Sequence, residues 1–376
     1  MSAPATVRGR LVLADRIAAG RVTIVDGMIA AVDLDPVPGD DPGPLVAPGF
    51  VDVHVHGWGG HDAMGGTDAL VGMARALARR GVTSFLPTAV SAQLATLERF
   101  TATAAAWRAG GGVDDGAEPL GINLEGPFLA PARKGAHDPT ALCDPAAVDE
   151  AALAPLLDGL RLITIAPELP GALDLIARLR DRGVAVSLGH SAATLVEARA
   201  GFRAGAAGTT HLFNAMTGID HRAPGLAAAA LLEDDAFVEL IADGHHVHPA
   251  LWALIRRAKS ADRLVLVSDA ISLAGTGDGR GRLGALEVEV ANGRVTLAGT
   301  TTLAGSVIAL DTAVRNLVGT DVPLPEAVAA AAANPLALIG QTDRGRIAVA
   351  QRADLVELDD DLVVRGVWLR GRRLDA

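Results

Sequence analysis

The chain has 376 residues, half of them hydrophobic, with a formal net charge of -11 and a single cysteine, Cys143. This length accommodates one large domain and a smaller one, and an acidic chain without a basic run excludes nucleic acid as its main partner. One cysteine excludes an internal disulfide framework and favours a cytoplasmic protein. The first residues show no apolar signal segment, and no run reaches ~18 apolar residues, so neither secretion nor a membrane span is expected.

Short strands are predicted at both ends of the chain. Residues 1–47 contain the segments GRLVLAD and GRVTIVDGMIAAVD followed by a loop over 35–44, and residues 344–376 have the same β-like character. Neither end is long enough to bury a core alone. We therefore expect the two ends to pair into one small β-sandwich domain, with residues 48–343 forming a larger domain between them.

Between the two ends, strand patterns alternate with helical ones, which is typical of a parallel sheet. Helices are expected at 68–80, 195–205 and 324–340, and a hairpin at 284–299 with Asn292-Gly293 as its turn. Eight strand–helix units predict an α/β fold of the (β/α)8 TIM-barrel type. The strand candidates span residues 50–56, 83–89, 120–126, 161–168, 184–190, 208–215, 238–246 and 263–270.

The first barrel strand carries two histidines one residue apart. Side chains alternate faces along a strand, so Asp52, His54 and His56 share one face. Two imidazoles on the inward face of a buried strand are costly unless something uses their nitrogens. This stretch therefore has two interpretations: the histidines bind a metal ion, or they are core residues whose nitrogens are hydrogen-bonded.

Polar residues also follow several other predicted strands, where barrel enzymes place their chemistry. Each one alone could be a satisfied core residue or a turn cap. Together, imidazoles and carboxylates from separate strands at one barrel mouth suit a divalent ion such as zinc or iron. These residues are Glu125, His190, His211, Asn214, Asp243, His245, His246 and Asp269.

A set of longer motifs extends this pattern. In chain order they are PGFVDVHVHGWGG, LEGPFLAPARKGAHDP, SLGHSAAT, THLFNAMTGIDHRAPG, IADGHHV, LVSDA and LAGS. With these motifs the chain resembles the amidohydrolase superfamily and, within it, the N-acetylglucosamine-6-phosphate deacetylases, over roughly residues 48 to 306. The combination of LEGPF with GAH, and that of HLFNAM with a following Arg-x-Pro-Gly, are specific to the deacetylases, whereas two histidines alone indicate only the superfamily.

The resemblance implies a ligand set for the metal. Glu125, His190 and His211 match the ligands of the main ion. Many binuclear amidohydrolases bridge two ions with a carbamylated lysine on strand four, but the segment RLITIAPE has no lysine. Some deacetylases replace the first two histidines and use one ion. Because this chain keeps His54 and His56, we expect one or two divalent ions per subunit, with Zn2+ as the first candidate and Fe2+, Mn2+ and Co2+ as alternatives.

The resemblance also implies a reaction, the hydrolysis of N-acetylglucosamine 6-phosphate to glucosamine 6-phosphate and acetate. Hydroxide on the metal is expected as the nucleophile, with Asp269 as general base and then acid, and His137 helps to polarise the carbonyl. Arg222 and His246 match phosphate contacts, Arg222 reaching the site of a neighbouring subunit in a homodimer. The expected sugar contacts are Ala136, His137, Asn214, Ala215, Leu303, Ala304 and Gly305.

Three alternatives remain at this point. A sister deacetylase acts on N-acetylgalactosamine 6-phosphate, which differs at one hydroxyl, and the sequence alone does not decide between the two sugars. A cyclic amidase or aminohydrolase is disfavoured by the missing strand-four lysine and by Glu125. A non-catalytic scaffold is disfavoured because the ligand set and Asp269 are complete.

Overall fold

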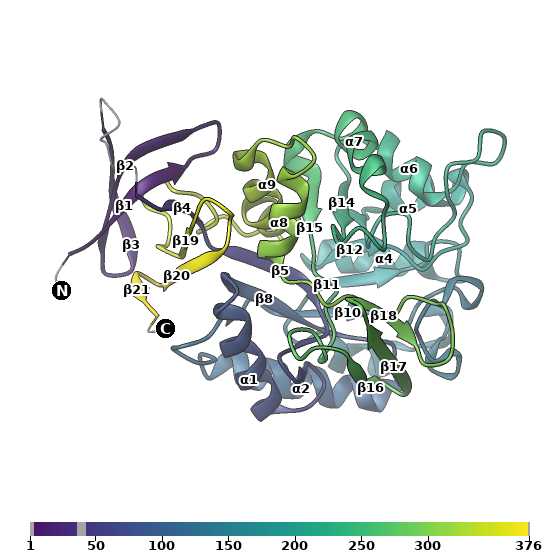
Figure 1. The fold of residues 1–376 in the computed structure, drawn as a ribbon. Coiled ribbons are helices and arrows are strands. Elements are labelled where there is room, and N and C mark those ends of the chain that lie inside the picture. The colour runs from purple at the N-terminus through teal and green to yellow at the C-terminus, as the bar shows by residue number, and fades with distance from the viewer. Residues whose placement is uncertain (1–3, 36–42, 375–376) are drawn as a thin grey trace.

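The computed structural model describes residues 4–35 and 43–374. It confirms the expected α/β fold: a (β/α)8 barrel stands beside a separate sheet that both chain ends build (Figure 1). The predicted domain boundaries themselves stay a prediction. The loop predicted over 35–44 lies mostly outside the described residues.

The sheet of the chain ends has seven strands in the order β21-β20-β19-β4-β1-β2-β3. Strand β19 pairs antiparallel with β4, so the C-terminal strands continue the N-terminal ones. Val7, Leu11 and Leu355 belong to the apolar core of this sheet, which neither end could form by itself. Its strands are β1 (Ala5–Val12), β2 (Ile17–Val25), β3 (Met28–Leu34), β4 (Leu45–Pro48), β19 (Leu355–Leu358), β20 (Val364–Leu369) and β21 (Arg372–Arg373).

All eight predicted barrel strands are present and parallel, in the order β15-β14-β13-β12-β11-β10-β8-β5. Most are shorter than predicted, because the chain leaves the ladder before the polar residues that follow each strand. The strands are β5 (Phe50–Val55), β8 (Val82–Ala89), β10 (Ile122–Glu125), β11 (Leu160–Ile165), β12 (Ala185–Leu188), β13 (Gly208–Thr209), β14 (Phe237–Leu240) and β15 (Leu264–Leu266). A further strand, β9 (Glu118–Pro119), pairs with β8.

The barrel is closed between its first and last strands by a few irregular contacts. The N–H of Asp269 donates to the carbonyl of His54 at 2.9 Å, and the N–H of His56 donates to the carbonyl of Ala270 at 2.8 Å. The buried Asp52 carboxylate adds to this seam, because its Oδ1 accepts from the N–H groups of His54 and Ser268. The seam therefore sets the residues around Asp269 directly against the two histidines of β5.

Helices surround the barrel, and local signals define their ends. Helix α5 begins with a capping box between Thr194 and Glu197 and ends at Gly205 in the left-handed region. The single helix predicted over 324–340 is wrong, since the chain breaks at Ala332 and restarts before Pro335, which a first helical turn tolerates. None of the helices in the described part of the chain has the length and apolar character of a membrane span.

The helices are α1 (Thr67–Ala78), α2 (Leu94–Ala109), α3 (Glu150–Leu153), α4 (Ala172–Asp181), α5 (Leu195–Ala204), α6 (Leu226–Leu232), α7 (Pro249–Ala258), α8 (Leu310–Val318), α9 (Leu324–Ala331) and α10 (Ala333–Leu338). Short 3-10 turns lie at Pro131–Arg133, Pro139–Ala141, Pro145–Ala147, Ala154–Leu157 and Ala261–Arg263. Two short strands, β6 (Gly57–Trp58) and β7 (His61–Asp62), pair after β5.

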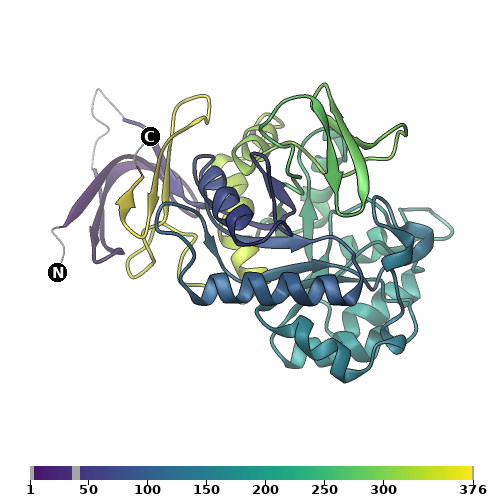
Figure 2. The same cartoon turned by 90° about the horizontal axis from the view of Figure 1, so that it is seen from below.

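A small antiparallel sheet follows the last barrel strand. The predicted hairpin is confirmed as β17 (Leu286–Ala291) and β18 (Arg294–Leu297), and Asn292 and Gly293 both have positive φ, as its two-residue turn requires. Sequence reasoning missed the third strand, β16 (Gly279–Leu283). Figure 2 shows this sheet, in bright green, well separated from the purple and yellow sheet of the chain ends.

Candidate active site

A cavity of about 360 Å3 opens at the ends of the barrel strands. Most of the predicted site residues line it. Of the predicted set, His54 lies fully buried, Ala304 packs into the core of the small sheet, and Arg222 is exposed outside the lining. The predicted residues in the lining are His56, Glu125, Ala136, His137, His190, His211, Asn214, Ala215, His246, Asp269, Leu303 and Gly305.

Glu125, at the end of β10, is the centre of the site. Its Oε1 lies 2.8 Å from Nε2 of His211 and 3.0 Å from Nε2 of His190, and these two nitrogens are 3.2 Å apart. Burial raises the pKa of Glu125, but the surrounding imidazoles, led by His137, hold it well below its ordinary value. The three residues predicted to bind the main ion therefore converge on one point around an ionised carboxylate.

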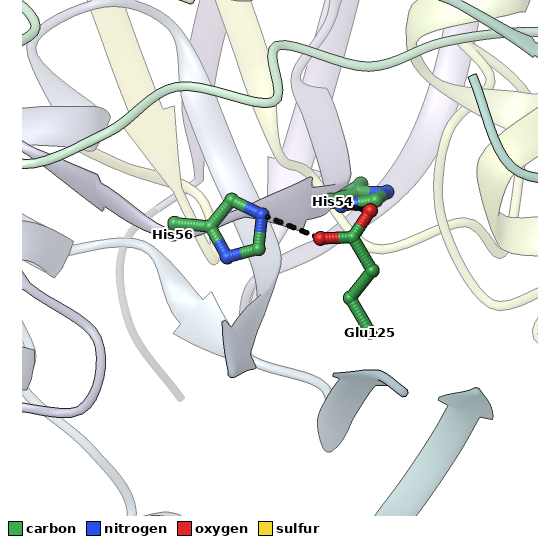
Figure 3. A group of neighbouring side chains, drawn as sticks. All are labelled: His54, His56 and Glu125. Atoms are coloured by element: carbon green, nitrogen blue, oxygen red, sulfur yellow. Dashed lines mark ion pairs between the residues drawn. The ribbon is translucent and has the colours of Figure 1, made fainter. Parts of the chain in front are cut away.

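The other side of Glu125 faces the two histidines of β5 (Figure 3). Nε2 of His56 lies 3.2 Å from Oε2 of Glu125 and 3.1 Å from Oδ1 of Asp269. Nε2 of His54 is 3.7 Å from Glu125 and 3.6 Å from Asp269. The ligand atoms of His54, His56 and Glu125 lie within 4.8 Å of one another, as a shared ion requires.

The outer nitrogens of three histidines define how these rings face the carboxylates. Nδ1 of His54 donates to Glu239, Nδ1 of His56 to the carbonyl of Thr88, and Nδ1 of His190 to the carbonyl of Arg133. Each inner Nε2 of a neutral ring therefore points a lone pair at a carboxylate oxygen.

The lone pair of an imidazole Nε2 and that of a carboxylate oxygen repel at such distances unless a second proton or a cation lies between them. Burial lowers the pKa of His56, but its carboxylate neighbours raise it to about 9, so without a cation the proton is held. Imidazoles anchored from outside and turned toward a carboxylate are the usual setting of a divalent metal. The residues present thus fit the ion that the sequence predicts.

His137 differs from these rings in its tautomer. The backbone N–H of Ser91 donates to its Nδ1 at 3.2 Å, so that nitrogen carries the lone pair. The Nε2–H is then a donor, and it lies 3.2 Å from Oε2 of Glu125. Burial lowers the pKa of His137 to about 4, so the ring is neutral at pH 7. Although His137 is close enough to Glu125 and His190 to join a metal group, its tautomer makes it a hydrogen-bond donor rather than a ligand.

Asp269 stands at the seam of the barrel with a strained backbone. Its φ is 48°, and those of His190 and His211 are 46° and 27°, a region that non-glycine residues seldom adopt and that clusters at functional sites. Burial raises the pKa of Asp269, but His56 and His54 lower it below its ordinary value. The carboxylate is therefore ionised and able to accept a proton.

His246 also lines the cavity, where it is held by Asp243. Its Nδ1 lies 2.7 Å from Oδ2 of Asp243, and Oδ1 of Asp243 accepts the N–H groups of His245 and His246. Burial lowers the pKa of His246, but Asp243 raises it above its ordinary value. Asp243 thus favours the protonated, cationic form of His246 in a cavity whose lining also contains Glu125 and Asp269.

The predicted partner of His246 is not brought to this cavity within one chain. Arg222 lies in an exposed loop, where its N–H donates to Asp220 and Ile219 is 54% exposed beside it. Within one chain the cavity lining therefore contains His246 but not Arg222.

Comparison with known proteins identifies the family. The model of the amidohydrolase family matches residues 45–374. The chain belongs to the amidohydrolase family. It is 41% identical to the N-acetylgalactosamine-6-phosphate deacetylase of Escherichia coli O157:H7, over 94% of both chains. It is 38% identical to the N-acetylglucosamine-6-phosphate deacetylase of Vibrio furnissii, over 88% of this chain and 83% of that protein.

Solved structures of amidohydrolases agree over the whole fold. The N-acetylglucosamine-6-phosphate deacetylase of Thermotoga maritima superposes with a TM-score of 0.91 and 34% identity, covering 99% of both chains. A mutant of the Mycobacterium smegmatis enzyme, in complex with N-acetyl-D-glucosamine-6-phosphate, gives a TM-score of 0.92 and 35% identity over 100% of both chains.

Sequence reasoning missed one buried acid of this amidohydrolase site. Glu239 on β14 contacts both His54 and the backbone of His211. The signal was present, because Glu239 is the only polar residue of the run FVELIA. An acid inside a buried strand is costly unless it is paired, so it marks a site.

Proposed function

We propose that this amidohydrolase cleaves the acetamide of N-acetylglucosamine 6-phosphate to give glucosamine 6-phosphate and acetate. The observation that carries this proposal is the cavity itself, in which Glu125 and its histidines share one wall with the ionised Asp269 and the donor His137. Relatives that carry this activity in their names cover most of the chain. A carbonyl hydrolase needs an activated water, a polarised carbonyl and a proton for the leaving amine, and this wall has a group for each.

The resident group is a divalent ion, which supplies a water of lowered pKa and polarises the carbonyl when bound. Glu125, His190 and His211 are its proposed ligands, and His54 and His56 are those of a second ion. The donor set suits zinc as the first candidate, with iron, manganese and cobalt as alternatives.

The protein's own groups then move the protons. Asp269 is ionised at pH 7, so it takes a proton from the attacking water and passes it to the amine nitrogen as the C–N bond breaks. His137 is neutral and offers its Nε2–H to the carbonyl oxygen, where negative charge develops. The Nδ1 of His137 is fixed by Ser91, so the donor needs no change of tautomer during the reaction.

The phosphate is held at the other end of the cavity. His246 binds it as a cation, and Arg222 of a neighbouring subunit completes the site in a homodimer, because Arg222 of the same chain lies outside the lining. Asn214, Ala215, Ala136, Leu303 and Gly305 line the sugar pocket between the two ends. The cytoplasmic location predicted from the single cysteine stays a prediction.

The galacto epimer is the second candidate substrate, and one observation favours it. The relative with 41% identity over 94% of both chains is an N-acetylgalactosamine-6-phosphate deacetylase. Acetate release should be compared for both phosphorylated epimers and for unphosphorylated N-acetylglucosamine, with the metal content measured on the same sample. A higher kcat/KM for the galacto sugar replaces the gluco assignment, and no release from a metal-loaded protein overturns both.

A further inference from the structure

Glu239 occupies an unusual place in the barrel. It lies on β14 with 1% of its surface exposed, and its neighbours Val238 and Leu240 turn into the apolar layer. Its side chain lies beneath the floor of the cavity rather than in the lining. Neither His54 nor Glu239 lines the cavity, although both contact residues that do.

One oxygen of Glu239 connects the two halves of the metal centre. Its Oε2 accepts from Nδ1 of His54 at 3.2 Å and from the backbone N–H of His211 at 3.1 Å. His54 faces the second ion and His211 the main one. The other oxygen, Oε1, is buried without a hydrogen-bond partner among the described residues. Glu239 thus keeps His54 in the tautomer that turns Nε2 toward Glu125.

The charges around this point are also unbalanced. Glu125, Asp269 and Glu239 are buried carboxylates, and within the described ranges no lysine or arginine pairs with any of them. Buried acidic side chains without such a partner are costly unless something else balances them, and the ligand atoms of His54, His56 and Glu125 lie close enough together to hold a cation.

We propose that Glu239 is a positioning residue that holds the ion of His54 and His56 by fixing His54, and that it couples this ion to the one held by His211. The inference rests on the metal dependence of the proposed function. Removing such an outer partner of a metal-bound histidine weakens metal affinity by about 10- to 100-fold.

Metal binding tests this without substrate. The full-length protein is stripped, reloaded with Zn2+ or Co2+, and analysed for equivalents bound per chain and for the visible spectrum of the cobalt form. The wild type is expected to hold two ions, and Glu239→Ala to bind one of them about 10- to 100-fold more weakly, with an altered cobalt spectrum. Glu239→Gln is expected to lose less, because an amide oxygen still accepts from His54.

Two controls separate positioning from general damage. Glu357→Gln removes a partly buried carboxylate of the end sheet and should bind both ions normally. In the pair His54→Ala and Glu239→Ala, the double variant should lose no more affinity for the ion of His54 and His56 than His54→Ala alone, because Glu239 acts on that ion through His54. If Glu239→Ala fails to fold by circular dichroism, Glu239→Gln carries the test.

The inference is overturned by a wild type that saturates at one ion, or by Glu239 variants with wild-type affinity and spectrum. It is also overturned if the double variant shows fully additive losses. A protein that binds two ions but releases no acetate overturns the proposed function alone, since metal content is measured separately.

Discussion

The two ends of the cavity are built differently. At the metal end, seven side chains converge, six from the ends of five barrel strands and His137 from a loop, and all seven are buried in one chain. At the proposed phosphate end, the chain supplies His246 with its partner Asp243, while Arg222 lies on an exposed loop. The difference indicates that the proposed metal end is complete within one chain, whereas the proposed contact of Arg222 with the phosphate requires a second chain.

Removal of the metal changes only the metal end of the cavity and should have the largest effect on activity. We expect chelation to abolish acetate release and added Zn2+, Fe2+, Mn2+ or Co2+ to restore it to different extents. Because a bound ion stabilises only the folded state, the loaded protein should also unfold at a higher temperature, with about 2.7 kcal/mol gained at a hundredfold excess over Kd. Unchanged activity in a protein shown to be free of metal would contradict the assignment of Glu125, His190 and His211.

Asp269→Asn tests the same end with a smaller change. Asparagine tolerates the positive φ of this position, so the backbone should be kept. Without a group that transfers the proton, kcat should fall by about 10²- to 10⁴-fold. KM and metal content should stay near the wild-type values. A variant with near-normal kcat would remove Asp269 from the mechanism.

Some features of the fold and the site could be predicted from the sequence, and others depend on contacts between distant parts of the chain. The strand ends were predictable, because imidazoles and carboxylates in otherwise apolar runs are costly unless they serve a site. The tautomer of His137 was not, since it depends on the N–H of Ser91, which is 46 residues away along the chain. The break at Ala332 was missed because alanine-rich periodicity continues across it, and only the tertiary packing decides where such a helix restarts.

Arg222→Ala addresses the phosphate end. A lost hydrogen bond to a charged group costs about 1.5–3 kcal/mol, so KM for the phosphorylated sugar should rise by about 10- to 100-fold. The kcat should change little, and the unphosphorylated sugar should be unaffected. An equal loss for both sugars would show that Arg222 does not read the phosphate.

A mixing experiment then asks which subunit uses Arg222. The Arg222→Ala chain keeps its metal end, and the Asp269→Asn chain keeps its arginine. If the arginine acts across a dimer, mixed dimers gain one complete site and recover low-KM activity that neither variant has alone. Mixed dimers without such recovery would place Arg222 in the site of its own chain or outside the mechanism.

The smallest effect expected is on the pH dependence of KM. Asp243 raises the pKa of His246 above its ordinary value, so the ring is a cation below that pKa and loses its charge as the pH rises through it. KM for the phosphorylated sugar should therefore rise with pH over this range, while KM for the unphosphorylated sugar stays flat.

Asp243→Asn sharpens that test, because an asparagine Oδ1 still accepts the N–H groups of His245 and His246. Burial then lowers the pKa of His246 against a smaller opposing charge, since Asp269 still raises this pKa, so the rise in KM should move to lower pH. A profile that does not move would mean that a cation other than His246 holds the phosphate within the chain, and that the two ends of the cavity differ less than their geometry indicates.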